Sequence, residues 1–274
     1  MRRGSRTLRT ARPTYSDKGL ELRAPESWRE MTQRQLRYTL FLLWTFQDPW
    51  DVRVRMLARF TGLKVWGRSG KGAWLCHWRA GFLGLRRRWV TLMDWQLRSL
   101  AERFSYVDRY EDMGCRLEAI HGLRAVDVHL HGVAFIDYLN AEKYYQAFVR
   151  SREERFLDKL ATLLYRRKGG ELARRVRMKP WERLGVFLWY SYVKSELGRQ
   201  FPHFFKKLPA DRQEEYDMMA AINAQVRALT DGDITQEEAI FKSDCWRALT
   251  ELDAKAREAE ELRKAEERAR RGGK

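Results

Sequence analysis

The stretch FIDYLNAEKYYQAFVRSREERFLDKLATLLYRRK, residues 135–168, decides the fold class of this chain. Large apolar side chains recur in each half at three- and four-residue steps, namely Phe135, Tyr138, Leu139, Tyr145 and Phe148, then Phe156, Leu157, Leu160, Leu163 and Leu164. That spacing predicts two consecutive amphipathic helices that meet near Arg150 and Ser151. Ser151 with Glu154 predicts a capping box at the start of the second helix. Each apolar stripe needs partner helices, so the pair predicts a helical body.

The flanking segments carry further helix signals. Thr32 with Gln35 predicts a capping box, Asp48-Pro49 predicts the start of the next helix, and Gly62 predicts its left-handed end. Further helices are expected from Pro180 to near Gly198, from about Asp211 to Leu229, and, after a capping box of Thr235 with Glu238, as one long helix to about Arg270. The expected class is therefore mainly α, a single helical domain of about seven to eight helices. Its expected parts are a flexible basic arm (1–24), a helical domain (25–250) that contains a basic aromatic hairpin insertion (63–89), and a charged helical tail (251–274).

Residues 63–78 depart from the helical pattern. The β-prone runs LKVW and AWLCHW flank the glycine-rich segment GRSGKG, which predicts a β-hairpin that projects from the helical body. Helical spacing returns at Thr91, where Leu92, Trp95, Leu100 and Phe104 are expected on one face of a helix that ends near Tyr106. Farther on, alternating apolar residues at Val126, Val128 and Leu130 predict one short strand.

Composition limits the cellular setting. The longest apolar runs, at 40–44 and 186–190, are much shorter than the roughly 20 residues that a membrane helix needs, so no membrane association is expected. The cysteines Cys76, Cys115 and Cys245 are widely separated and suggest no disulfide framework. Free thiols are typical of a reducing compartment, so the expected location is the cytoplasm.

The net charge of +17 is concentrated in three segments. Residues 1–24 carry a surplus of five positive charges, residues 64–89 a surplus of seven, and residues 166–183 a surplus of six. Residues 64–89 contain no acidic side chain. The basicity therefore belongs to local surfaces that could meet nucleic acid or an acidic protein.

Motifs for catalysis, cofactors and metals are weak. The Gly67–Gly72 segment resembles a phosphate-binding loop but has Val65 and Gly72 where the motif requires glycine and Ser or Thr. The acidic turn at Asp231 lacks the glycine and glutamate that complete a calcium loop. His129 and His131 share one side of the expected strand, but no third ligand follows at a metal-site spacing. No enzyme, cofactor or metal is therefore expected.

The most suggestive segment is 64–89, in which cations alternate with tryptophans. Lysine and arginine neutralise phosphates, and exposed aromatic rings stack on unpaired bases. The alternative is that the tryptophans face the core while the cations are solvated. Candidate residues for binding nucleic acid or a protein partner are Lys64, Trp66, Arg68, Lys71, Trp74, Trp78, Arg79, Arg86, Arg87 and Arg88, with Arg174, Arg175 and Arg177 from the third basic segment.

Several stretches resemble, as a set, an uncharacterised family of proteins from Bacteroidales phages and prophages. They are APESW at Ala24–Trp28 with the following MTQRQL, then GVAFIDYLNAEKYYQAF, LATLLYRR, RQFPHFF, ALTDGDITQEEAI and CWRALTELDAKA. The resemblance covers most of residues 24–260, and it involves packing and capping residues. It implies a non-enzymatic tail-assembly chaperone-like protein that binds another tail component in the cytoplasm of a bacterial host cell. The basic segment 64–89 is a departure from that pattern and supports the alternative, a nucleic-acid-binding accessory protein.

Overall fold

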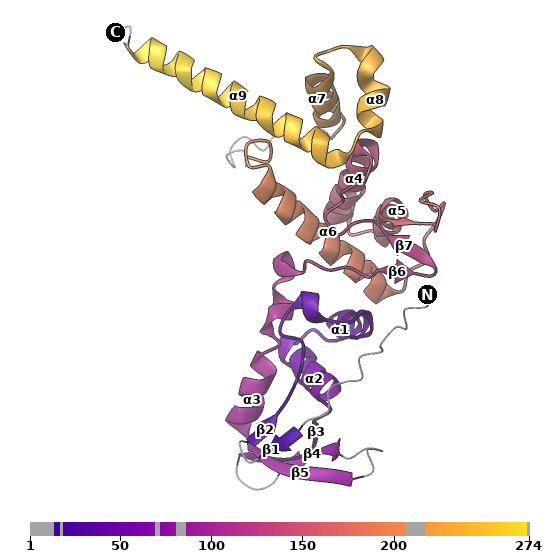
Figure 1. The fold of residues 1–274 in the computed structure, drawn as a ribbon, viewed down its shortest axis with the longest axis vertical. Helices are drawn as coiled ribbons and strands as arrows, with labels where there is room; N and C mark the ends of the chain where they lie inside the picture. Colours follow the sequence, from indigo (N-terminus) through magenta and orange to yellow (C-terminus); the bar gives the residue numbers. More distant parts are fainter. Residues whose placement is uncertain (1–13, 17–18, 69–71, 81–85, 207–217, 273–274) are drawn as a thin grey trace. The chain divides into compact units, whose positions relative to one another are not determined.

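The computed structural model describes residues 14–16, 19–68, 72–80, 86–206 and 218–272 (Figure 1). Helices predominate among them, and the mainly α class is confirmed. The chain divides into two compact units. The first unit comprises residues up to Cys115 together with Pro180–Leu184, and the second comprises Arg116–Lys179 and Gly185–Lys274.

The first unit begins its helical part with the expected helical hairpin, α1 (Gln33–Thr45) and α2 (Pro49–Thr61). Thr32 and Gln35 form the predicted capping box, in which the side chain of each accepts a hydrogen bond from the backbone N–H of the other. Asp48 caps α2 by accepting a hydrogen bond from the backbone N–H of Trp50, and Gly62 ends the helix in the left-handed region at φ 75°. These signals were readable because each involves residues that are close in sequence.

A three-stranded antiparallel sheet follows, with β3 (Lys64–Arg68), β4 (Ala73–Ala80) and β5 (Arg86–Met93) in that order. The predicted hairpin is confirmed, but the third strand was not expected. The helix predicted from Thr91 begins only at α3 (Asp94–Glu102), where Trp95 is 66% exposed. Tertiary pairing explains the difference, because β5 pairs along its whole length with β4.

Two short strands, β1 (Thr14–Ser16) and β2 (Gly19–Glu21), pair antiparallel. This part of the expected flexible arm therefore has regular backbone structure. The remainder of the arm up to residue 13 lies outside the described residues.

Short 3-10 helices complete the first unit: η1 (Trp28–Glu30), η2 (Ser105–Asp108) and η3 (Tyr110–Asp112). Trp28 joins them, because its indole Nε1 donates to the carbonyl oxygens of Tyr106 at 2.9 Å and Arg109 at 3.2 Å. The Tyr106 hydroxyl in turn donates to the carbonyl of Pro25 at 3.1 Å. Hydrogen bonds thus accompany the burial of the Trp28 side chain.

The second unit contains the two helices predicted from residues 135–168, α4 (Phe135–Ser151) and α5 (Glu154–Leu164). The predicted capping box of Ser151 with Glu154 is wrong. Ser151 donates to the carbonyl of Ala147 and accepts from the N–H of Glu153, so it closes the end of α4. Arg152 then takes a left-handed conformation, and Glu153 occupies the N-cap position of α5.

The second unit also contains a small antiparallel sheet, formed by β6 (Ala119–Ile120), β7 (Leu123–Ala125) and β8 (Tyr165–Arg166) in that order. The strand predicted at Val126–Leu130 is absent from the described structure of that segment, which forms turns instead. Asp127 accounts for this, because its Oδ1 accepts hydrogen bonds from the backbone N–H groups of His129 and His131. Burial opposes ionisation of Asp127, but these hydrogen bonds hold its pKa below the usual value.

The helix predicted from Pro180 is confirmed as α6 (Pro180–Gln200). Downstream lie α7 (Met218–Thr230), the 3-10 helix η5 (Ile234–Gln236), α8 (Glu237–Lys242) and α9 (Cys245–Gly272). The start of the helix predicted from about Asp211 falls outside the described residues.

The predicted single helix from Thr235 to Arg270 is wrong, because the helix is interrupted between α8, which ends at Lys242, and α9, which begins at Cys245. Asp233 caps η5 by accepting from Thr235, which displaces the predicted capping box of Thr235 with Glu238. Asp244 then caps α9: its Oδ1 accepts from the N–H of Trp246, and its Oδ2 accepts from the N–H of Gly132. Asp244 therefore links the start of α9 to the turn that precedes α4.

The outer part of α9 is exposed. Leu252 is its last buried side chain within the described range, and the residues after Glu260 are exposed up to Arg271. Lys206 and Lys264 both contact the Glu260 carboxylate, and they hold its pKa at about 2.

Among the described helices, none combines the length and the apolar character that crossing a membrane requires.

The three cysteines are free thiols. Cys76 and Cys245 are buried and Cys115 is half-buried. Burial raises the pKa of Cys245 to about 12 and also raises the pKa of Cys76. Both buried thiols are therefore poor nucleophiles at neutral pH.

Candidate nucleic-acid interface

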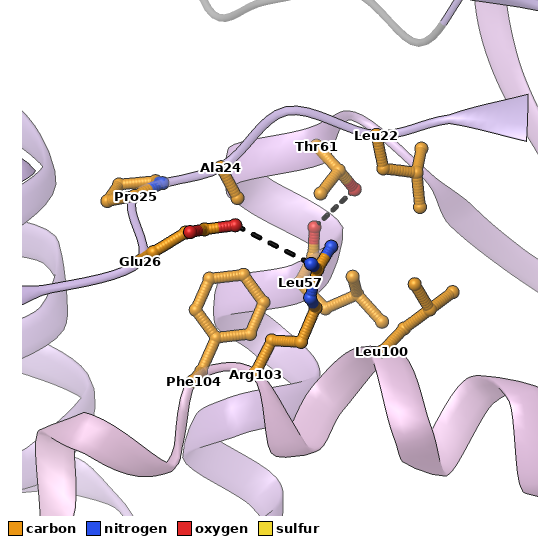
Figure 2. A pocket seen from close by; sticks show the side chains of 9 residues that line it. All are labelled: Leu22, Ala24, Pro25, Glu26, Leu57, Thr61, Leu100, Arg103 and Phe104. Carbon is orange, nitrogen blue, oxygen red and sulfur yellow. Dashed lines mark hydrogen bonds and ion pairs between the residues drawn. The ribbon is translucent and has the colours of Figure 1, made fainter.

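A small pocket in the first unit offers little room for a ligand. It lies between α2, α3 and the segment before η1 and encloses about 20 Å³, room for about one water molecule. Figure 2 shows apolar side chains such as Leu57, Leu100 and Phe104 around it, with an ion pair between Arg103 and Glu26 at its mouth. Exposed ion pairs of this kind are common on surfaces and contribute little to stability.

The histidine pair in the second unit has a packing role. His131 stacks on Trp246 with 4.3 Å between ring centroids, and the Trp246 indole donates to the carbonyl of His129. Within the part of the chain that the structure describes, no three His, Cys, Asp or Glu side chains gather as a metal site would require. Both histidines therefore contribute to the packing around Trp246.

The sheet β3–β4–β5 separates the tryptophans of residues 64–89 by face. Residues directly opposite each other across antiparallel strands point to the same side. His77 pairs with Lys64 and with Trp89, whereas Trp78 pairs with Arg88 and Cys76 pairs with Val90. One face thus carries Trp78 and Cys76, which are 2% and 0% exposed, and it belongs to the core.

The opposite face, here called the outer face, carries two exposed tryptophans. Trp66 is 66% exposed and Trp89 is 44% exposed. The pairing of β3 with β4 shifts between Val65 and Gly67, so Trp66 sits at a β-bulge. Bulges redirect a side chain, and here the Trp66 ring contacts the rings of His77 and Trp89.

His77 holds this aromatic group together. Its ring stacks on Trp89 with 4.8 Å between centroids and an interplanar angle of 19°, and it meets the edge of Trp66 at 5.9 Å. The Trp66 and Trp89 rings are themselves perpendicular, with centroids 5.8 Å apart. His77 is only 8% exposed, and its Nδ1 lies 3.3 Å from the carbonyl oxygen of Lys64.

Three cations surround the aromatic group on the outer face. Lys64 on β3 lies directly opposite His77 on β4. Arg79 on β4 lies directly opposite Arg87 on β5, two residues along each strand from the pair of His77 with Trp89. All three side chains are exposed. One step on the same face of a strand is about 7 Å. The arginine pair is therefore within reach of anything that contacts Trp89.

The other candidate residues lie in different places. Trp74 is half-buried, donates to Asp94, and carries the guanidinium of Arg68 over its ring at 5.1 Å. Trp78 faces the core, and its Nε1 has no hydrogen-bond partner among the described residues. Arg88 is exposed and pairs with Trp78, Arg86 is placed only as a strand residue, and Lys71 lies outside the described residues. Arg174, Arg175 and Arg177 are exposed, but they belong to the second unit.

His77 was missed by sequence reasoning. In a strand, His77 must lie on the face opposite to its neighbour Trp78, because successive side chains alternate. Which of the two faces is the outer one depends on how the strands pair and pack. Without the third strand, nothing in the sequence placed His77 beside Trp89.

No protein-family model, curated protein or solved structure matches this chain. The geometry of the outer face therefore carries the functional argument, and the resemblance to a phage family stays a prediction.

Proposed function

We propose that this chain is a non-enzymatic nucleic-acid-binding protein that uses the outer face of the sheet β3–β4–β5. The observation that carries the proposal is the pair of exposed tryptophans, Trp66 and Trp89, set among the exposed cations Lys64, Arg79 and Arg87. Residues 52–93 contain no carboxylate, so no acidic side chain of the sheet strands neutralises these charges. Cations next to exposed rings are typical of surfaces that bind phosphate and bases together.

Salt dependence tests this function. We expect the affinity for a fluorescein-labelled oligonucleotide, measured by anisotropy, to fall roughly twentyfold between about 50 and 200 mM KCl, because three phosphate contacts on a single strand give a slope of log K against log[salt] near −2. The double variant Arg79→Ser/Arg87→Ser should make that slope shallower by about 1.4.

The matched control removes the same charge elsewhere. Arg263 and Arg268 are exposed on α9, and the variant Arg263→Ser/Arg268→Ser should leave the slope unchanged. If this control makes the slope as shallow as the sheet variant does, net charge and not the outer face determines binding. Affinity that is independent of salt would contradict phosphate neutralisation altogether.

A second candidate function is the phage tail-assembly role, in which the chain binds a tail component in the bacterial cytoplasm. It is favoured by the exposed outer part of α9, where Leu262 is 63% exposed among charged residues. We expect the full chain to retain a tail protein in co-expression pull-downs, and a chain that stops after Arg257 to lose it. Failure of the full chain to enrich any tail protein would count against this role.

A further inference from the structure

We infer that the ligand of the outer face is a single strand whose unpaired bases stack on Trp66 and Trp89. This inference deepens the nucleic-acid-binding function proposed above and rests on it. It names the substrate class, because stacking needs base faces that are accessible.

The exposure of Trp66 and Trp89 favours a stacking ligand. A tryptophan usually gains stability for the fold by burying its ring, as Trp78 does on the other face of the same sheet. Trp66 and Trp89 leave 66% and 44% of their surfaces in water although they contact each other. Rings that are displayed in this way are free to contact a flat apolar ligand such as a base.

The two exposed rings are also held in place before any ligand binds. His77 stacks on Trp89 and meets the edge of Trp66, so each exposed ring rests on a largely buried neighbour that belongs to the central strand. The bulge at Trp66 brings its ring toward the other two. Side chains that are already held in place lose little conformational freedom on binding, which favours affinity.

The positive charge around the aromatic group limits the class of ligand. Lys64, Arg79 and Arg87 would repel a cationic ligand, so the aromatic group does not suit a methylated lysine or another quaternary ammonium. An acidic protein surface would satisfy the cations but offers no flat partner for the two rings. A polyanion with aromatic bases satisfies both features.

Base pairing decides between the two forms of nucleic acid. In a duplex each base is stacked between its neighbours, so its faces are covered, whereas unpaired bases can be splayed onto aromatic side chains. The outer face of the three-stranded sheet exposes two aromatic rings. Such rings stack on exposed bases and do not distinguish them by the hydrogen-bonding groups at their edges. The expected binding therefore prefers single strands and tolerates different sequences.

The experiment compares three probes of about 15 nucleotides. They are fluorescein-labelled oligothymidylate, its duplex with oligoadenylate, and a strand of equal length with abasic sites throughout, which keeps the phosphates and removes the bases. We expect the full chain to bind the oligothymidylate at least tenfold more tightly than either of the other two. Trp66→Ala and Trp89→Ala should each weaken oligothymidylate binding about five- to hundredfold.

The same variants should leave binding of the abasic strand unchanged, because they alter only stacking. Trp95→Ala is the matched control, since Trp95 is equally exposed on α3 and is not part of the aromatic group; it should bind like the wild type. Trp66→Phe and Trp89→Phe should recover part of the affinity. If an alanine variant does not fold, the comparison of probes on the wild-type chain still decides the matter.

The outcomes separate the two levels of the proposal. Equal, salt-dependent binding of all three probes would overturn the stacking inference and leave the nucleic-acid-binding function standing. Binding of none of the probes would overturn both.

Discussion

Trp28→Ala is expected to lower the free energy of unfolding by about 3–5 kcal/mol. Trp28 is only 1% exposed, so its removal would leave a large cavity where η1 packs against η2. The loss would also remove the donor for the carbonyl oxygens of Tyr106 and Arg109, which the Trp28 indole joins. A buried acceptor without a donor adds to the cost.

Urea denaturation followed by circular dichroism measures this effect. The control is Trp95→Ala, which removes an equally large but 66% exposed side chain from the same unit and should change stability by no more than about 0.5 kcal/mol. A loss below about 1 kcal/mol for Trp28→Ala would contradict its place in the core, because buried large-to-small substitutions cost more than that.

Trp189→Ala is expected to have an effect of similar size, about 3–5 kcal/mol, in the second unit. Trp189 is fully buried on α6, and its indole Nε1 donates to the carbonyl of Val128 at 2.9 Å. Its ring meets Tyr165 edge to face at 6.0 Å, and the Tyr165 hydroxyl donates to the carbonyl of Leu117. Removing Trp189 would therefore weaken the packing of α6 against Tyr165 of the small sheet and against the turn that contains Val128.

The same denaturation experiment reports on Trp189, with Leu262→Ala on α9 as the control. Leu262 is 63% exposed in the same unit, so its substitution should be close to neutral. A shift of the unfolding midpoint as large for Leu262→Ala as for Trp189→Ala would show that the outer part of α9 is packed in solution, contrary to its exposure here.

Features that depend on neighbours in the chain were predictable. The capping box of Thr32 with Gln35, the Asp48-Pro49 helix start and the Gly62 end all follow from backbone groups within one helical turn. The apolar stripes of residues 135–164 likewise gave α4 and α5, because a three- to four-residue repeat suits only one regular structure.

Two predicted capping boxes failed because the same polar side chains had other local partners. Ser151 donates to Ala147 at the end of α4, and Thr235 is engaged by Asp233. Short hydroxyl side chains can satisfy either the helix before them or the helix after them. The sequence shows both options, and the packing of the adjoining helices selects one.

The candidate site divides in the same way. The sequence by itself determined that residues 64–89 are basic, lack carboxylates, contain tryptophans and begin with a hairpin. Only the tertiary structure decided that β5 adds a third strand, that Trp78 faces the core, and that the bulge brings Trp66 to His77 and Trp89. The physical reason is that strand register sets the face of every side chain, and register depends on pairing between strands, which composition and spacing do not specify.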